Sequence, residues 1–179
     1  TIVHAAGLCH RDLKPPHVVT YLQNHDQIAN SAYGQRLHQL TSPGQYRALT
    51  ALMLLMPGTP MLFQGQEFGA SSPFLYFADH NPDLAKQVEE GRSDFLAQFP
   101  SIRHSRTEFT KGVPHARGTF EECKLDHAER QKHSRLTAFH KDLLKLRRED
   151  PVFREQRSDW MHGGVLGPEA FVLRFMGGE

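Results

Sequence analysis

Residues 17–27 read HVVTYLQNHDQ, a short apolar run followed by a cluster of polar side chains. β-Branched and aromatic residues fill most of the first six positions, which is typical of a β-strand. The apolar run then stops at Gln23 and gives way to Asn24, His25, Asp26 and Gln27. We therefore expect a strand over residues 17–22 with polar side chains at its carboxyl end.

A helix is predicted downstream of this cluster. Ser42 is a favourable N-cap, Pro43 suits the first helical position, and Gln45 stands where the second half of a capping box belongs. Apolar residues recur along the helix as far as Met56, and the Pro-Gly pair at 57–58 ends it. The apolar surface is wide, as expected for a helix that packs on a sheet.

A second strand follows this helix at residues 60–63, PMLF. It is apolar on both faces, which indicates a strand buried in a parallel sheet. Strand, helix and strand joined by short connections form a βαβ unit, whose two strands run parallel. The sequence thus predicts an α/β protein.

The rest of the chain offers weaker signals. Helices are predicted at residues 82–98, with Asn81 as N-cap, and at about 134–148, and a further strand at residues 170–175. Residues 100–130 read as loop.

The composition is that of an ordinary globular protein. The 179 residues contain 21 Lys and Arg against 20 Asp and Glu, so the formal charge is +1. This balance provides no electrostatic footprint for nucleic acid or an acidic membrane surface, so we expect neither as a partner. No apolar stretch could span a bilayer, no signal peptide is visible, and Cys9 and Cys123 form no CxxC pair. We expect a cytoplasmic protein.

Two polar clusters follow the predicted strands, at residues 24–27 and 64–67. Active sites of α/β proteins lie at the carboxyl ends of parallel strands. Asp26 is a candidate base, nucleophile or stabiliser of a cation, and His25 could bind a substrate hydroxyl; the alternative is a hydrogen-bonded loop. Glu67, which lies between two glycines, has a simpler interpretation as the brace of a tight turn.

The histidines and the aromatic residues 74–77 are two further candidates for ligand binding. None of the 12 histidines is spaced for metal binding on one helical face, so neither a metal nor a cofactor is expected. Residues 74–77, FLYF, could stack on sugar rings or belong to the core, and both interpretations stay open.

A set of motifs is spread over the chain: QNHDQ at 23–27, MLFQGQEFG at 61–69, ASSPFLYFADH at 70–80, EGR at 90–92, and TFE with KLD at 119–126. Together, these motifs resemble the α-amylase superfamily of glycoside hydrolases, and within it the malto-oligosyltrehalose trehalohydrolase family. The resemblance extends over about residues 17–150. Gln66 stands where the family commonly has Glu, and His127 where Trp is usual.

This resemblance implies a (β/α)8 TIM barrel followed by a C-terminal β-sandwich. A complete barrel takes about 250 residues, so we expect a C-terminal fragment that holds the last quarter of one. Residues 18–22 and 60–63 would be its seventh and eighth strands. Residues 1–151 would complete the catalytic barrel, and residues 152–179 would begin the β domain.

The resemblance also implies a reaction. The family is retaining, with a nucleophilic Asp and an acid/base Glu that this chain lacks, so we expect the fragment to be inactive alone. Asp26 would stabilise the transition state, His25 would bind the same sugar ring, and Asn24 and Gln27 would lie close to substrate. The parent would hydrolyse the α-1,4 bond next to the terminal trehalose of malto-oligosyltrehalose, with malto-oligosyltrehalose synthase as its pathway neighbour. The alternatives are another α-glucan hydrolase of the superfamily and a non-catalytic carbohydrate-binding fragment.

Overall fold

The computed structural model describes residues 18–31, 33–98 and 112–177 of the chain. Cys9 lies outside these residues. Within them, no helix combines the length and apolar character needed to cross a lipid bilayer.

The described residues fall into two compact units, each formed by segments that are distant in sequence. Helices α4 and α9 pass through the boundary, so each contributes residues to both units. The first unit contains residues 18–21, 49–61 and 139–177, and the second contains the described parts of 22–48 and 62–138.

The first unit contains a parallel strand pair, which confirms the predicted orientation. Strand β1 (Val19–Thr20) pairs with β2 (Thr59–Pro60). Backbone hydrogen bonds from Thr59 N to Val18 O and from Met61 N to Thr20 O, 3.0 and 2.8 Å long, extend the pair. Both strands are shorter than predicted, because each has a neighbour on one side only among the described residues.

Helix α4 (Pro43–Leu55) connects the two strands and confirms the predicted helix. Gln45 N donates to Ser42 Oγ over 3.2 Å, and Ser42 N donates to Gln45 Oε1 over 3.4 Å. These two bonds form the predicted capping box. Within the first unit, Thr50 and Leu54 of this helix are fully buried.

Arg147 of helix α9 (Ser134–Glu149) closes the carboxyl end of α4 within the first unit. Its guanidinium donates to the carbonyl oxygens of Leu54 and Met56 over 2.7 and 2.8 Å, and also to Gly58 O. A helix end exposes carbonyl oxygens without intrahelical partners, and these bonds satisfy them.

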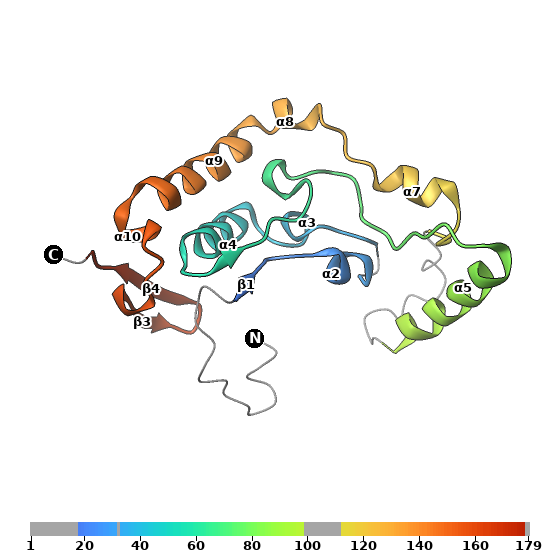
Figure 1. The fold of residues 1–179 in the computed structure, drawn as a ribbon, viewed down its shortest axis with the longest axis horizontal. Helices are drawn as coiled ribbons and strands as arrows, with labels where there is room; N and C mark the ends of the chain where they lie inside the picture. The colour runs from blue at the N-terminus through green and yellow to red at the C-terminus, as the bar shows by residue number, and fades with distance from the viewer. Residues whose placement is uncertain (1–17, 32, 99–111, 178–179) are drawn as a thin grey trace. The chain divides into compact units, whose positions relative to one another are not determined.

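The C-terminal part of the first unit is an antiparallel hairpin, drawn in dark red in Figure 1. Strand β4 (Ala170–Phe175) matches the predicted strand, and its partner β3 (Met161–Gly167) was missed. β3 carries three glycines and no alternation of polar and apolar residues, so it has no strand pattern of its own. A short helix, α10 (Pro151–Arg154), and a 3-10 turn, η3 (Ser158–Trp160), precede the hairpin.

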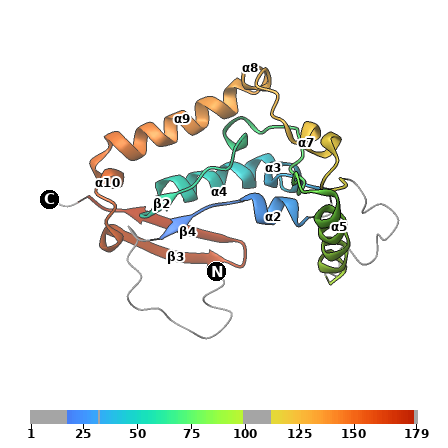
Figure 2. The same ribbon diagram turned by 45° about the vertical axis from the view of Figure 1, so that its right-hand side comes forward.

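The second unit contains mostly short helices. The predicted helix with Asn81 as N-cap is confirmed as α5 (Pro82–Ala97), green in Figure 2, since Leu84 N donates to Asn81 Oδ1 over 3.0 Å. The other helical elements are α2 (His25–Ala29), α3 (Leu37–Leu40), η2 (Gln66–Phe68), α7 (Arg117–Cys123) and α8 (Glu129–Lys132).

The prediction of loop over residues 100–130 is wrong where α7 and α8 lie; residues 99–111 lie outside the described part. No side chain caps the start of α7, and Gly118 and Thr119 are poor helix formers. Tertiary packing stabilises this helix instead, because Thr119 and Cys123, one turn apart, are both buried.

Replacing Arg147 tests its role at the end of α4. In the full-length protein, Arg147→Ala leaves several half-buried carbonyl oxygens without a donor, which lowers the free energy of unfolding by about 2–4 kcal/mol. Urea denaturation measures the change.

The neighbouring Arg148 is a matched control, since its side chain is 73% exposed and forms an ion pair with Glu149 on the surface. Arg148→Ala changes the stability by less than about 0.5 kcal/mol. Equal effects of the two substitutions would contradict the role given to Arg147.

Candidate functional site

The polar cluster after β1 forms the first turn of helix α2. Asn24 Oδ1 accepts hydrogen bonds from Asp26 N at 2.8 Å and Gln27 N at 3.3 Å, and Gln27 Oε1 accepts one from Asn24 N at 3.0 Å. This is a reciprocal capping box, which stabilises the first turn of α2. The Asn-x-x-Gln spacing was a signal for this helix that the sequence analysis missed.

His25 and Asp26 lie side by side on this turn. His25 Nε2 is 3.3 Å from Asp26 Oδ1, and each side chain is 66% exposed. Asp26 lies in the first turn of α2, the position in a helix where acidic side chains are favourable. The structure therefore presents an accessible carboxylate with an imidazole beside it.

Arg92 of α5 fixes the other end of α2. Its Nη1 donates to Asn30 Oδ1 over 3.1 Å, its Nη2 donates to Ala29 O, and its guanidinium lies 4.6 Å from the ring centre of Tyr76. Burial lowers the pKa of Arg92. Both ends of the five-residue helix are thus held by side chains, which limits how far His25 and Asp26 can move.

The second polar cluster lies on a loop that Arg36 holds. The Arg36 side chain is fully buried, and it donates from Nη1 to Gln64 O over 2.6 Å and from Nε to Ser72 O over 2.7 Å. Its guanidinium also lies 5.7 Å from the ring centre of Phe63. Burial lowers the pKa of Arg36. One side chain therefore joins both ends of the loop.

Glu67 lies on the 3-10 turn η2 within this loop. Gly65 and Gly69 flank the turn with φ angles of 78° and 62°, which favour glycine. Glu67 Oε1 pairs with Arg130 Nη2 of α8 at 3.2 Å. This pairing agrees with the expectation that Glu67 braces a turn.

Gln66 is one of the two positions where the sequence departs from the family that it resembles. It is fully buried, its Oε1 accepts from Phe63 N over 3.2 Å, and its carbonyl oxygen accepts from Tyr46 Oη over 2.9 Å. The uncharged amide therefore takes a structural role inside the loop.

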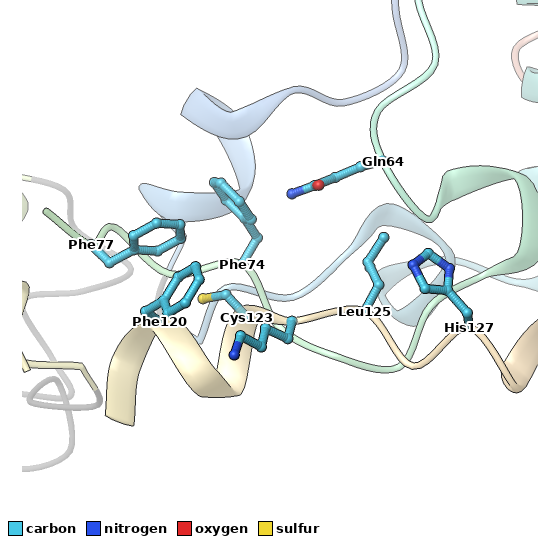
Figure 3. Close-up of a pocket in the computed structure, with 8 residues that line it drawn as sticks. Gln64, Phe74, Phe77, Phe120, Cys123, Leu125 and His127 are labelled. Atoms are coloured by element: carbon cyan, nitrogen blue, oxygen red, sulfur yellow. The ribbon is translucent and has the colours of Figure 1, made fainter. Parts of the chain in front are cut away.

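A cavity of about 280 Å³ opens beside this loop, within the second unit (Figure 3). Leu75 of the FLYF motif is buried, as the core interpretation expects, whereas Phe74 and Phe77 line the cavity. The remaining lining residues are Gln64, Phe120, Cys123, Lys124, Leu125 and His127.

The sequence analysis missed this cavity. Five of its lining residues lie at 120–127, on α7 and the turn after it, where a loop was predicted. In the described part of the chain, no three His, Cys, Asp or Glu side chains gather as a metal site would require.

Several known proteins similar to this chain are malto-oligosyltrehalose trehalohydrolases. A malto-oligosyltrehalose trehalohydrolase of Deinococcus radiodurans is 38% identical over 176 residues, which is 97% of this chain and 29% of that protein. One of Brevibacterium helvolum is 41% identical over 140 residues, 76% of this chain and 23% of that protein. The chain thus spans about a quarter of the length of these relatives. The first match, over 176 residues, is longer than the stretch of about residues 17–150 in which the sequence motifs lie. No protein-family model matches the chain.

A solved structure agrees with these relatives. The crystal structure of a candidate α-amylase from Salmonella typhimurium is 35% identical in sequence, with a TM-score of 0.71, and the match covers 86% of this chain and 25% of that one. The fold of this chain is therefore α-amylase-like over the matched part.

Substituting Gly65 tests the loop geometry. A Cβ atom there would lie 2.7 Å from Ala70 Cβ and 2.8 Å from Leu125 Cδ2, at a φ that side chains rarely adopt. Gly65→Ala therefore lowers the free energy of unfolding by about 2–3 kcal/mol. Chemical denaturation measures it.

Gly118→Ala is the control, because a Cβ at Gly118 on α7 meets nothing within 4 Å. This substitution raises stability by about 0.5–1 kcal/mol through helix propensity alone. A Gly65 variant as stable as the wild type would refute the account of the turn.

Proposed function

This chain is a homologue of one segment of the malto-oligosyltrehalose trehalohydrolases, and we propose that it is part of a glycosidase with that activity. The reaction is hydrolysis of the α-1,4 bond next to the terminal trehalose unit of malto-oligosyltrehalose, with release of trehalose. The exposed pair of His25 and Asp26, 3.3 Å apart on the turn after β1, is the observation that carries the proposal.

Asp26 acts as the stabiliser of the transition state in this proposal. Retaining glycosidases pass through a transition state with oxocarbenium-ion character. The Asp26 carboxylate is accessible to a sugar ring and bears the charge that opposes the developing positive charge. This attraction strengthens as substrate displaces water from the site. His25, beside it, donates a hydrogen bond to a hydroxyl of the same ring.

Asn24 and Gln27 stabilise the turn that carries His25 and Asp26. Their side-chain oxygens cap α2 and so fix the turn on which the pair lies. Their amide nitrogens remain available in this proposal for hydroxyls of a neighbouring ring.

The nucleophilic Asp and the acid/base Glu belong to other segments of the protein in this proposal. In retaining enzymes these two carboxyl groups lie about 5 Å apart on either side of the scissile bond. The matched relatives are about four times longer than the matched segment, which leaves room for both acids. The 179 residues alone therefore lack turnover.

The place of the chain in a barrel is likewise a proposal. β1 and β2 are assigned to the seventh and eighth strands of a (β/α)8 barrel, residues 1–151 to its last part, and residues 152–179 to the start of a β domain. The parallel pairing of β1 with β2 supports the first assignment, and the antiparallel hairpin supports the last.

The expected substrate is an uncharged oligosaccharide, and the enzyme works in the cytoplasm beside the synthase that makes malto-oligosyltrehalose. Another α-glucan hydrolysis is the second candidate, favoured by the likeness to a candidate α-amylase. Product analysis separates the two, because glucose or maltose without trehalose from malto-oligosyltrehalose would support the second candidate and refute the first.

Substituting Asp26 tests the mechanism. In the full-length protein, Asp26→Asn lowers kcat by about 100-fold or more, since it removes charge stabilisation from the transition state. The fold is unaffected, because the backbone N–H of Asp26 and not its carboxylate takes part in the cap. Steady-state kinetics and circular dichroism measure the two effects.

Asp142→Asn, on the exposed face of α9, is the matched control and leaves kcat unchanged. An unchanged kcat in the Asp26 variant would remove this residue from the mechanism.

A further inference from the structure

The cavity in the second unit has the size of a site for one small ring. Its volume of about 280 Å³ lies just below the usual range of ligand pockets, which is about 300–1,000 Å³. Three segments form its walls: Gln64 after β2, the FLYF motif at 74–77, and residues 120–127 on and after α7. Figure 3 shows Phe74, Phe77 and Phe120 gathered on one side of it, with Gln64 and His127 on the other.

The aromatic side of the cavity suits the C–H face of a sugar. The rings of Phe74 and Phe77 meet edge to face with centres 5.8 Å apart, and those of Phe77 and Phe120 likewise at 5.2 Å. Lys124 Nζ lies over the Phe120 ring, 4.9 Å from its centre, so a ligand can stack only on the part of this ring that the lysine leaves open. Phe120 is 43% exposed and is the most accessible of the three.

The polar side of the cavity suits hydroxyl groups. The Gln64 side chain is exposed, and its amide both donates and accepts hydrogen bonds. His127 is also exposed, and its ring nitrogens can donate or accept a hydrogen bond. Hydroxyls need partners of both kinds, and a few such groups on an apolar wall fix the orientation of a ligand.

The charges around the cavity favour an uncharged ligand. Lys124 Nζ is 2.5 Å from Glu121 Oε2, so its charge is compensated. Burial raises the pKa of the Cys123 thiol, which keeps this group neutral near pH 7. The described lining therefore offers no uncompensated cation for a phosphate or carboxylate.

The cavity wall is also tied to the segment that carries Asp26. Phe74 N donates to Gly34 O over 2.9 Å. Arg92 contacts the Tyr76 ring and donates to Ala29 O at the end of α2. A ring bound in the cavity is thus held at a fixed position relative to the turn with His25 and Asp26.

We propose that this cavity binds one pyranose ring of the oligosaccharide, as a subsite distinct from the His25 and Asp26 pair. The inference rests on the proposed function for the identity of the substrate. Phe120 supplies the stacking surface, and Gln64 binds the hydroxyls. The subsite contributes to binding and leaves the chemical step unchanged.

The test measures binding without turnover. Full-length protein with Asp26→Asn is titrated with maltopentaose by calorimetry, with and without Phe120→Ala. Loss of the stacking surface weakens binding by about tenfold, a change of about 1.4 kcal/mol. In otherwise wild-type protein, Phe120→Ala raises KM by a similar factor and leaves kcat unchanged.

Two further variants test the hydrogen bonds of Gln64 and control for the loss of an exposed aromatic side chain. Gln64→Ala removes an exposed side chain without disturbing packing, and it weakens binding through lost hydrogen bonds. Phe171→Ala on β4 is the matched control, since Phe171 is 58% exposed and does not line the cavity, and binding stays unchanged.

The outcomes separate this inference from the proposed function. Unchanged maltopentaose affinity in both cavity variants, or a fall in kcat at constant KM, overturns the subsite. Wild-type protein that releases no trehalose from malto-oligosyltrehalose overturns the proposed function, while the calorimetric comparison still decides whether the cavity binds sugar.

Discussion

The buried guanidinium of Arg36 is the interaction on which the site loops depend. It bonds the carbonyl oxygens of Gln64 and Ser72, so the intervening loop is closed at both ends by one side chain. Burying a charge is costly unless hydrogen bonds compensate it. Since Nη2 has no hydrogen-bond partner among the described residues, the compensation is incomplete. A shift of either carbonyl would remove one of the remaining bonds, so the loop has little freedom to rearrange.

Elements with local signals were predicted from the sequence, and those held by distant contacts were not. The capping residues Ser42 and Asn81 made α4 and α5 predictable, because a cap is a contact between residues that are close in sequence. Helix α7 has no such signal. Its Thr119 Oγ1 donates to Val113 O, and Cys123 Sγ accepts from Leu75 N, 48 positions away. No local pattern reveals a partner at that distance.

The candidate site divides in the same way. His25 and Asp26 could be selected because polar residues that follow an apolar strand are visible in one short segment. The cavity could not, since Phe77 and Phe120 meet only after the chain has passed through α5 and returned. The sequence shows aromatic residues at 74–77. Whether each of them belongs to the core or to a binding surface depends on which of them is covered by a helix that is distant in sequence.

The pairing of β1 with β2 has a consequence for the order of folding. Val19 and Thr59 are partners across 40 positions of sequence, and the ladder between them spans only two residues. Closing so long a loop costs more free energy, through lost conformational entropy, than the few hydrogen bonds of this ladder contribute. The strands therefore meet only after α4 has formed and shortened the connection between them. We therefore expect the parallel pair to form late in folding.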